Sequence, residues 1–188
     1  MPHPLDEALA WHCGPALAGM KAGNLVALNC VQIPDLHQRL HAYRQTLGGQ
    51  GILLEPLCDC GQRMLLLVCR PDRLSAALER PAARRILDGA GYPAGCDMGA
   101  MLAHLKTRLS DLEDFPHEIG LFLDYPPADV LGFQRRGGQG CKLCGHWKVY
   151  SNVRRARRLF RRYDRCRADA VRRVAQGESI LQIFPAAS

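Results

Sequence analysis

The strongest constraint on the fold is a long amphipathic helix near the C-terminus. Within residues 152–176, apolar side chains recur at steps of three, four and occasionally seven, the spacing of one helical face. This stripe consists of Val153, Ala156, Phe160, Tyr163, Cys166, Ala170 and Val174. A helix with one apolar stripe needs a core to pack against. A chain of 188 residues is long enough to supply that core, so residues 1–188 are predicted to form a single domain.

The other face of this predicted helix is rich in arginine. It carries Arg154, Arg155, Arg158, Arg161, Arg162 and Arg165. Residues 151–176 hold ten arginines and two aspartates, a local charge of +8, whereas the whole chain carries +7. Because cationic faces neutralise phosphates, one hypothesis is that this face binds nucleic acid or an acidic partner. The chain uses 21 arginines and 4 lysines throughout, and its helix aromatics lie on the apolar stripe, which weakens the nucleic-acid interpretation.

Short apolar runs between helical segments predict a small sheet. Residues 51–57 and 63–70 are joined by the turn-like sequence CDCGQ, which predicts a β-hairpin. Residues 25–30 and 147–150 are predicted as further strands. Helices are predicted at residues 5–13, 34–47, 71–90 with a break near Pro81, 97–109, 117–123 and 127–136. The predicted class is therefore α/β or α+β, with a mixed sheet of about four strands, one hairpin and several packed helices.

The most specific sequence information lies in residues 115–150, FPHEIGLFLDYPPADVLGFQRRGGQGCKLCGHWKVY. FPHEIGLFL, the YPP turn followed by an Asp and GF, and CGHWKVY resemble the signature of domain-of-unknown-function family 3793, found mainly in anaerobic Gram-positive bacteria. The resemblance runs from HCGPALAGMKAGNL near the start to the final basic helix. It implies no particular activity, although genes of this family often lie near iron-transport and flavodoxin genes, which implies a link to iron or redox physiology. The resemblance implies a Gly at the position where this chain has Asp124.

Polar residues with unusual neighbours recur in the HCGPALAGMK and FPHEIG segments and favour a binding module. The leading hypothesis is a module that binds a small anionic ligand, a cofactor or a metal. Its candidate ligand-binding residues are His12, Lys21, Asn24, Tyr125, Lys148 and Tyr150, together with His117 and Glu118. The two lysines stand out because lysine is so rare in this chain. The identity of any cofactor and the oligomeric state stay open.

An alternative hypothesis is a thiol-dependent enzyme. Cys13 would be the nucleophile, His117 its base, and Glu118 a third catalytic candidate. A reactive thiol needs a base or positive charge nearby, and adjacent residues on a helix do not face each other, so His12 is a poor base for Cys13. A zinc-hydrolase motif is excluded at His117, because the residue four positions later is Leu121.

Nine cysteines without an evident secretory signal predict reduced thiols in a cytoplasmic protein. Cys58-x-Cys60 and Cys141-x-x-Cys144 resemble two halves of a zinc site, so Cys141 and Cys144 are candidate metal ligands. The longest apolar run, around residues 64–69, is far shorter than the ~20 residues that span a bilayer, so no membrane contact is predicted.

Overall fold

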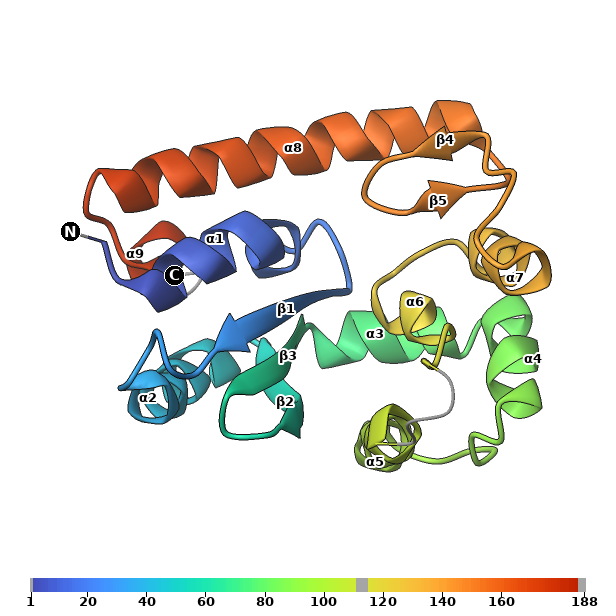
Figure 1. Cartoon of the computed structure of the whole chain (residues 1–188), viewed down its shortest axis with the longest axis horizontal. Helices are drawn as coiled ribbons and strands as arrows, with labels where there is room; N and C mark the ends of the chain where they lie inside the picture. The colour runs from blue at the N-terminus through green and yellow to red at the C-terminus, as the bar shows by residue number, and fades with distance from the viewer. Residues whose placement is uncertain (1, 111–114, 186–188) are drawn as a thin grey trace. The chain divides into compact units, whose positions relative to one another are not determined.

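The computed structural model describes residues 2–110 and 115–185 and combines helices with short antiparallel strands (Figure 1). The predicted mixed α/β class is confirmed. Contacts divide the chain into two compact units, the first formed by residues 1–72 and 163–188 and the second by residues 73–162. Whether residues 1–188 behave as a single domain stays a prediction. Among the described residues, no helix has both the length and the apolar composition needed to cross a membrane.

The first unit is built on a three-stranded antiparallel sheet in the order β1-β3-β2. The strands are β1 (Gly23–Asn29), β2 (Leu53–Asp59) and β3 (Arg63–Cys69). The predicted hairpin is thus β2–β3, and β1 pairs with the free edge of β3. Pro56 lies in β2, an edge strand, where a residue without an N–H is tolerated, and the register shifts beside it.

Two helices, α1 (Pro4–Leu17) and α2 (Leu36–Gly48), pack against this sheet. The unit is completed by α9 (Ile180–Ile183), which contacts α1 and α2, and by residues 163–175 of α8 (Val153–Ala175). In Figure 1, α1 lies between α8 and β1, and α1 contacts both β1 and β3. The shared core draws on all these elements and includes Leu5, Leu9, Val26, Leu40, Leu66, Ala170 and Ile180. The apolar stripe predicted for α8 is therefore confirmed as its packing face.

The prediction that the first helix ends near Gly14-Pro15 is wrong, since α1 runs to Leu17. Proline has no N–H and disturbs the hydrogen bonds of its own turn. Tertiary partners complete this end instead. The side-chain oxygen of Asn24 accepts the N–H of Ala16 at 3.1 Å, and the Arg70 guanidinium donates to the carbonyls of Ala16 and Leu17 at 3.0 and 2.6 Å.

The second unit is mainly helical. It contains α4 (Pro81–Gly89), α5 (Met98–Ser110), α6 (Ile119–Phe122), α7 (Pro127–Arg136) and most of α3 (Pro71–Leu78). A short antiparallel hairpin follows, whose strands β4 (Leu143–Cys144) and β5 (Lys148–Val149) have two residues each. Residues 153–162 of α8 complete the unit. The predicted break at Pro81 is confirmed. At the start of α5, the Asp97 side chain accepts the N–H of Ala100 at 2.8 Å.

Two predicted boundaries in this unit change. The helix predicted over residues 117–123 is the single turn α6, and His117 and Glu118 lie in the turn before it. The strand predicted over residues 147–150 is shorter, because Trp147 and Tyr150 lie outside β5. α7 ends as expected at Gly137, whose φ of 54° is the left-handed conformation that glycine favours at helix ends.

Candidate functional site

A groove of about 700 Å³ lies between α4 and α7 in the second unit. Its lining positions are 82, 85, 86 and 89 on α4, position 90 just after α4, and 127, 128, 131, 134 and 135 on α7. These positions recur every three to four residues, so each helix presents one face to the groove. The lining is apolar at Ala82, Ile86 and Leu131 and basic at Arg85, Arg108 and Arg135. No acidic side chain is found among the described residues that line it.

Two of the three arginines are exposed and available to a ligand. The side chains of Arg85 and Arg135 form no hydrogen bond or ion pair with any other described residue. A guanidinium stays charged at any physiological pH and offers five donors in a planar fork. The first turn of α7, at Pro127 and Ala128, also lines the groove, and the partial positive charge of a helix N-terminus favours anions there.

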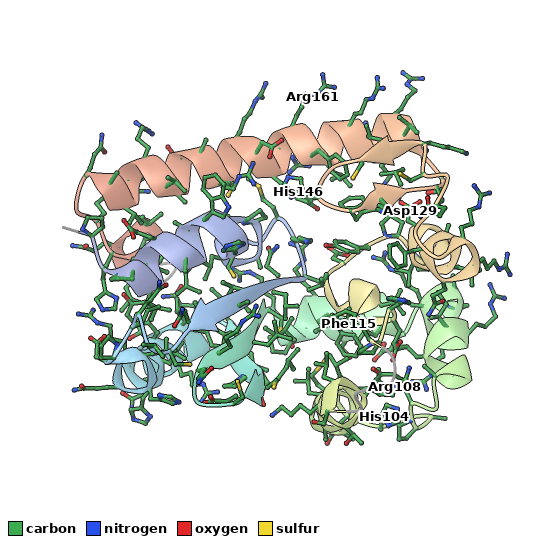
Figure 2. The ribbon with its side chains drawn as sticks, in the orientation of Figure 1. His104, Arg108, Phe115, Asp129, His146 and Arg161 are labelled. Atoms are coloured by element: carbon green, nitrogen blue, oxygen red, sulfur yellow. The ribbon has the colours of Figure 1, made fainter. Side chains whose placement is uncertain are left out.

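The third arginine is held in place by a buried carboxylate. The Arg108 guanidinium donates to Oε1 of Glu118 at 3.0 Å, and Glu118 is only 2% exposed. The Tyr92 hydroxyl donates to the same oxygen at 3.4 Å, and its ring lies 4.2 Å from that of His104. Burial and the adjacent Glu118 carboxylate raise the pKa of Tyr92. Figure 2 shows Arg108 and His104 together on α5, so this helix positions both the ion pair and its aromatic support.

A second buried carboxylate organises the segment from α7 to α8. Asp129 accepts the indole N–H of Trp147 at 2.8 Å and the backbone N–H groups of Tyr150 and Ser151 at 2.8 and 2.7 Å. The Tyr125 ring stacks on Trp147 at 5.1 Å, and its hydroxyl donates to the carbonyl of His146 at 3.0 Å. These contacts link the YPP turn, Asp129 and the HWKVY sequence to one another.

Small residues allow close packing in the same region. A Cβ on Gly132 would lie 2.6 Å from the Tyr150 ring, and one on Gly145 would lie 2.3 Å from the Phe160 ring. Both distances lie under 3.0 Å, which real Cβ atoms essentially never show, so a side chain at either position would force its neighbour to shift. The GF and CG elements of the sequence are therefore packing requirements.

A family model described as "Protein of unknown function (DUF3793)" matches residues 9–184. The chain belongs to the DUF3793 family. This result confirms the resemblance of the central segment and its extension to both ends of the chain. No curated protein and no solved structure matches the chain.

The backbone at Asp124 suits the Gly that the family resemblance leads us to expect there. Asp124 has a φ of 56° and is the one described residue other than glycine with positive φ. Glycine adopts this left-handed conformation without steric cost, and Asp is among the residues that tolerate it. A glycine at this position is thus accounted for by chain geometry without any close approach to a ligand.

Cys13, the predicted nucleophile, lies in the core of the first unit and is 0% exposed. Burial raises the pKa of its thiol, and the charge of Lys21 opposes that shift. A raised pKa keeps the thiol protonated at neutral pH, which disfavours nucleophilic chemistry. The predicted base, His117, belongs to the second unit, where its ring packs edge-on against Phe133 at 4.9 Å. The pairing of Cys13 with His117 stays a prediction.

The other candidates near the start of the chain have structural partners. Lys21 is 2% exposed, and its amine lies 5.8 Å from the Tyr163 ring centroid. Asn24 caps the end of α1, as described above. His12 is exposed, and partial desolvation of its ring and the charge of Arg167 lower its pKa. Their role as ligand contacts stays a prediction.

The candidates around the β4–β5 hairpin also pack within the second unit. Lys148 donates to the carbonyl of Gly138 at 2.9 Å and lies 5.7 Å from the Phe133 ring centroid. Tyr150 is 8% exposed, and its hydroxyl has no hydrogen-bond partner among the described residues. Cys141 is half-buried and Cys144 is exposed. Within residues 2–110 and 115–185, no three His, Cys, Asp or Glu side chains form a group that could hold a metal ion, so the metal site at these two cysteines stays a prediction.

The arginine face of α8 is exposed. Arg154, Arg155, Arg158, Arg161, Arg162 and Arg165 all lie on this face. Figure 2 shows Arg161 on the outer side of the helix. None of these six side chains forms a hydrogen bond or ion pair with another described residue.

Sequence reasoning missed Arg85, Arg108 and Arg135. Arginine is the commonest charged residue of this chain, so no single arginine stands out in the sequence. The only usable signal was the helical spacing of residues 82–90 and 127–135. This spacing places Arg85 and Arg135 on one face of each helix but does not show that the two faces oppose each other.

Proposed function

We propose that this DUF3793 protein binds a small anionic ligand in the groove between α4 and α7. The observation that carries the proposal is the gathering of Arg85, Arg108 and Arg135 along one concavity of about 700 Å³ without an acidic lining residue among those described. Sites for small molecules commonly enclose about 300–1,000 Å³ and combine apolar walls with a few polar groups. The groove has both features.

The chemistry of the lining favours a carboxylate or phosphate attached to a small organic body. Arginine pairs with either anion through two parallel N–H···O bonds. Ala82, Ile86 and Leu131 would contact the organic part, and the first turn of α7 would favour negative charge near Pro127. Arg108 is oriented by Glu118 before any ligand arrives, which reduces the cost of ordering it. We place this activity in the cytoplasm, where nine free thiols would stay reduced.

Calorimetric titration of the full chain tests this proposal. The probes are inorganic phosphate, pyrophosphate, a nucleoside diphosphate and a tricarboxylate, each at low ionic strength. We expect at least one probe to bind, and Arg85→Gln with Arg135→Gln to weaken it by at least about tenfold, as the loss of charge-assisted hydrogen bonds implies. Both arginines are exposed, so the double variant is expected to fold.

The matched control is Arg155→Gln with Arg158→Gln on α8, which removes the same charge from exposed positions outside the groove. This control should retain the affinity of the unmodified protein. Equal weakening in both double variants would show a general charge effect and would reject the groove as the site. Failure of every probe to bind would also reject the proposal.

The exposed arginine face of α8 favours a second candidate function, the binding of a polyanion such as nucleic acid or an acidic protein. Six arginines without partners among the described residues lie along one helix. Phosphate neutralisation predicts an affinity that falls steeply with salt. Binding of a labelled single-stranded oligonucleotide that is lost in Arg158→Glu with Arg161→Glu, but kept in the groove variant, would support this function. Binding that is insensitive to salt would exclude it.

A further inference from the structure

A second pocket, of about 210 Å³, gathers three sulfur-containing side chains in the second unit. Cys96, Met98 and Met101 all line it. Met98 and Met101 are three residues apart on α5, so their side chains lie on neighbouring positions of one helix face. Cys96 comes from the loop just before that helix. The chain has five methionines, and two of them line this one pocket.

One arginine ties the walls of this sulfur pocket together. Arg84 on α4 donates to the carbonyls of Tyr92 and Pro93 at 2.7 and 3.1 Å, and so fixes the loop that carries Cys96. Both of these bonds come from Nη2, and Nη1 donates to Sδ of Met101 at 4.0 Å. The Cys96 thiol donates to the carbonyl of Pro93 at 3.2 Å. The guanidinium of Arg84 therefore contacts both the loop that carries Cys96 and the helix α5 that carries the two methionines.

The charged side chains at the sulfur pocket, one arginine and two carboxylates, favour a cation over an anion. The positive charge of Arg84 is balanced by Asp88, which it contacts at 2.6 Å. Glu79 lines the pocket, and its carboxylate accepts the hydroxyl of Ser75 at 2.9 Å. A cysteine that binds a metal does so as a thiolate, which would add a second negative charge.

We propose that Cys96, Met98 and Met101 form a binding site for a soft monovalent cation of the Cu⁺ class. Thiolate and thioether ligands select Cu⁺, whereas zinc sites in proteins use Cys, His and carboxylate ligands. Binding replaces the S–H bond of Cys96 with an S–Cu bond and releases one proton to solvent, without any change in oxidation state. The sulfur pocket shares no lining residue with the groove between α4 and α7, so this site is independent of the proposed anion binding.

Anaerobic titration of the full chain with Cu⁺, in competition with a chromophoric Cu⁺ chelator, tests the site. We expect one Cu⁺ to be withdrawn from the chelator per chain, with sulfur as the only scatterer in the first shell of its X-ray absorption spectrum. The decisive variant is Met98→Leu with Met101→Leu, because it removes both thioethers and leaves all nine thiols. It should weaken Cu⁺ binding by at least about tenfold, since two of three ligands are lost. Cys96→Ser should abolish binding at this competitor concentration.

The control is Cys30→Ser, which removes a half-buried thiol outside the sulfur pocket and should leave the affinity unchanged. Leucine is close to methionine in volume, and an unchanged unfolding midpoint would confirm that the double variant folds. Unchanged Cu⁺ affinity in the methionine variant would overturn the proposal, because binding would then depend on thiols alone. Zn²⁺ binding that depends on Cys96 but not on the methionines would overturn it as well.

Discussion

The indole nitrogen of Trp147 donates to one carboxylate oxygen of Asp129 at 2.8 Å, and the other oxygen accepts the backbone N–H groups of Tyr150 and Ser151. Asp129 is 2% exposed, so this carboxylate is compensated by hydrogen bonds rather than by water. It joins α7 to the β4–β5 hairpin and to the residues just before α8 (Figure 2). Asp129 therefore links separate parts of the segment 115–150 through its hydrogen bonds.

Asp129→Ala is expected to lower the free energy of unfolding by about 3–5 kcal/mol, because three donors, two of them in buried hydrogen bonds, lose their acceptor at once. Asp129→Asn keeps one acceptor oxygen and should lose less. Urea denaturation followed by circular dichroism measures both effects. Asp72→Asn, at an exposed position, is the control and should change stability by about 0.5 kcal/mol or less. A loss below about 1 kcal/mol for Asp129→Ala would contradict the role assigned to this carboxylate.

Two buried tyrosines should respond in opposite ways to removal of the hydroxyl. The Tyr150 hydroxyl has no partner among the described residues, so Tyr150→Phe is expected to be neutral or to stabilise the protein by up to about 1 kcal/mol. The Tyr43 hydroxyl donates to buried Asp6 at 2.7 Å, so Tyr43→Phe is expected to cost about 1–3 kcal/mol. Unfolding curves of the two variants, compared side by side, check both signs. A clear loss of stability in Tyr150→Phe would show that its hydroxyl has a partner in solution.

Glycine-to-alanine changes should separate packing from helix propensity. Gly132 lies in α7, and a Cβ there would lie 2.6 Å from the Tyr150 ring, so Gly132→Ala is expected to cost about 2–3 kcal/mol through overpacking. Gly48 ends α2, with no atom within 4 Å of an added Cβ, so Gly48→Ala is expected to gain about 0.5 kcal/mol. Thermal unfolding distinguishes the two. Equal effects would mean that Tyr150 yields to the methyl group.

Stability should decline at alkaline pH. Burial raises the pKa of Cys69 to about 12, with a contribution from Glu55, and burial raises the pKa of Tyr125 to about 12. Each folded pKa lies above the unfolded value, so the folded state keeps a proton that the unfolded state releases as the pH passes the ordinary values of 9.0 and 10.0. The stabilisation is therefore complete at neutral pH. It is lost above those values by about 1.4 kcal/mol per pH unit for each group.

Urea midpoints between about pH 8 and pH 11 measure this decline. Tyr125→Phe removes one of the titrating groups, so its stability should fall less steeply with pH, even though it also loses the hydrogen bond to His146 and starts lower. An identical slope in the variant would show that Tyr125 has an ordinary pKa in the folded protein. Tyrosinate absorbance of the folded protein provides an independent reading of the same pKa.

Much of the secondary structure could be predicted because it depends on local periodicity. The apolar stripe of α8, the β2–β3 hairpin, the break at Pro81 and the end of α7 at Gly137 all follow from side-chain spacing or from backbone rules for proline and glycine. The end of α1 could not be predicted in this way. Its continuation past Pro15 depends on Asn24 and Arg70, which are distant in sequence and replace bonds that the helix cannot make for itself.

The candidate sites show the same division. By itself, the sequence determined the family, the mixed class of the fold, the arginine face of α8 and the close spacing of Cys96, Met98 and Met101. Only the tertiary structure decided that Arg85 and Arg135 face one groove, and that the carboxylates of Glu118 and Asp129 are buried in hydrogen-bond networks. The physical reason is that spacing along a helix sets which residues share a face, whereas the partner of that face depends on how distant segments pack.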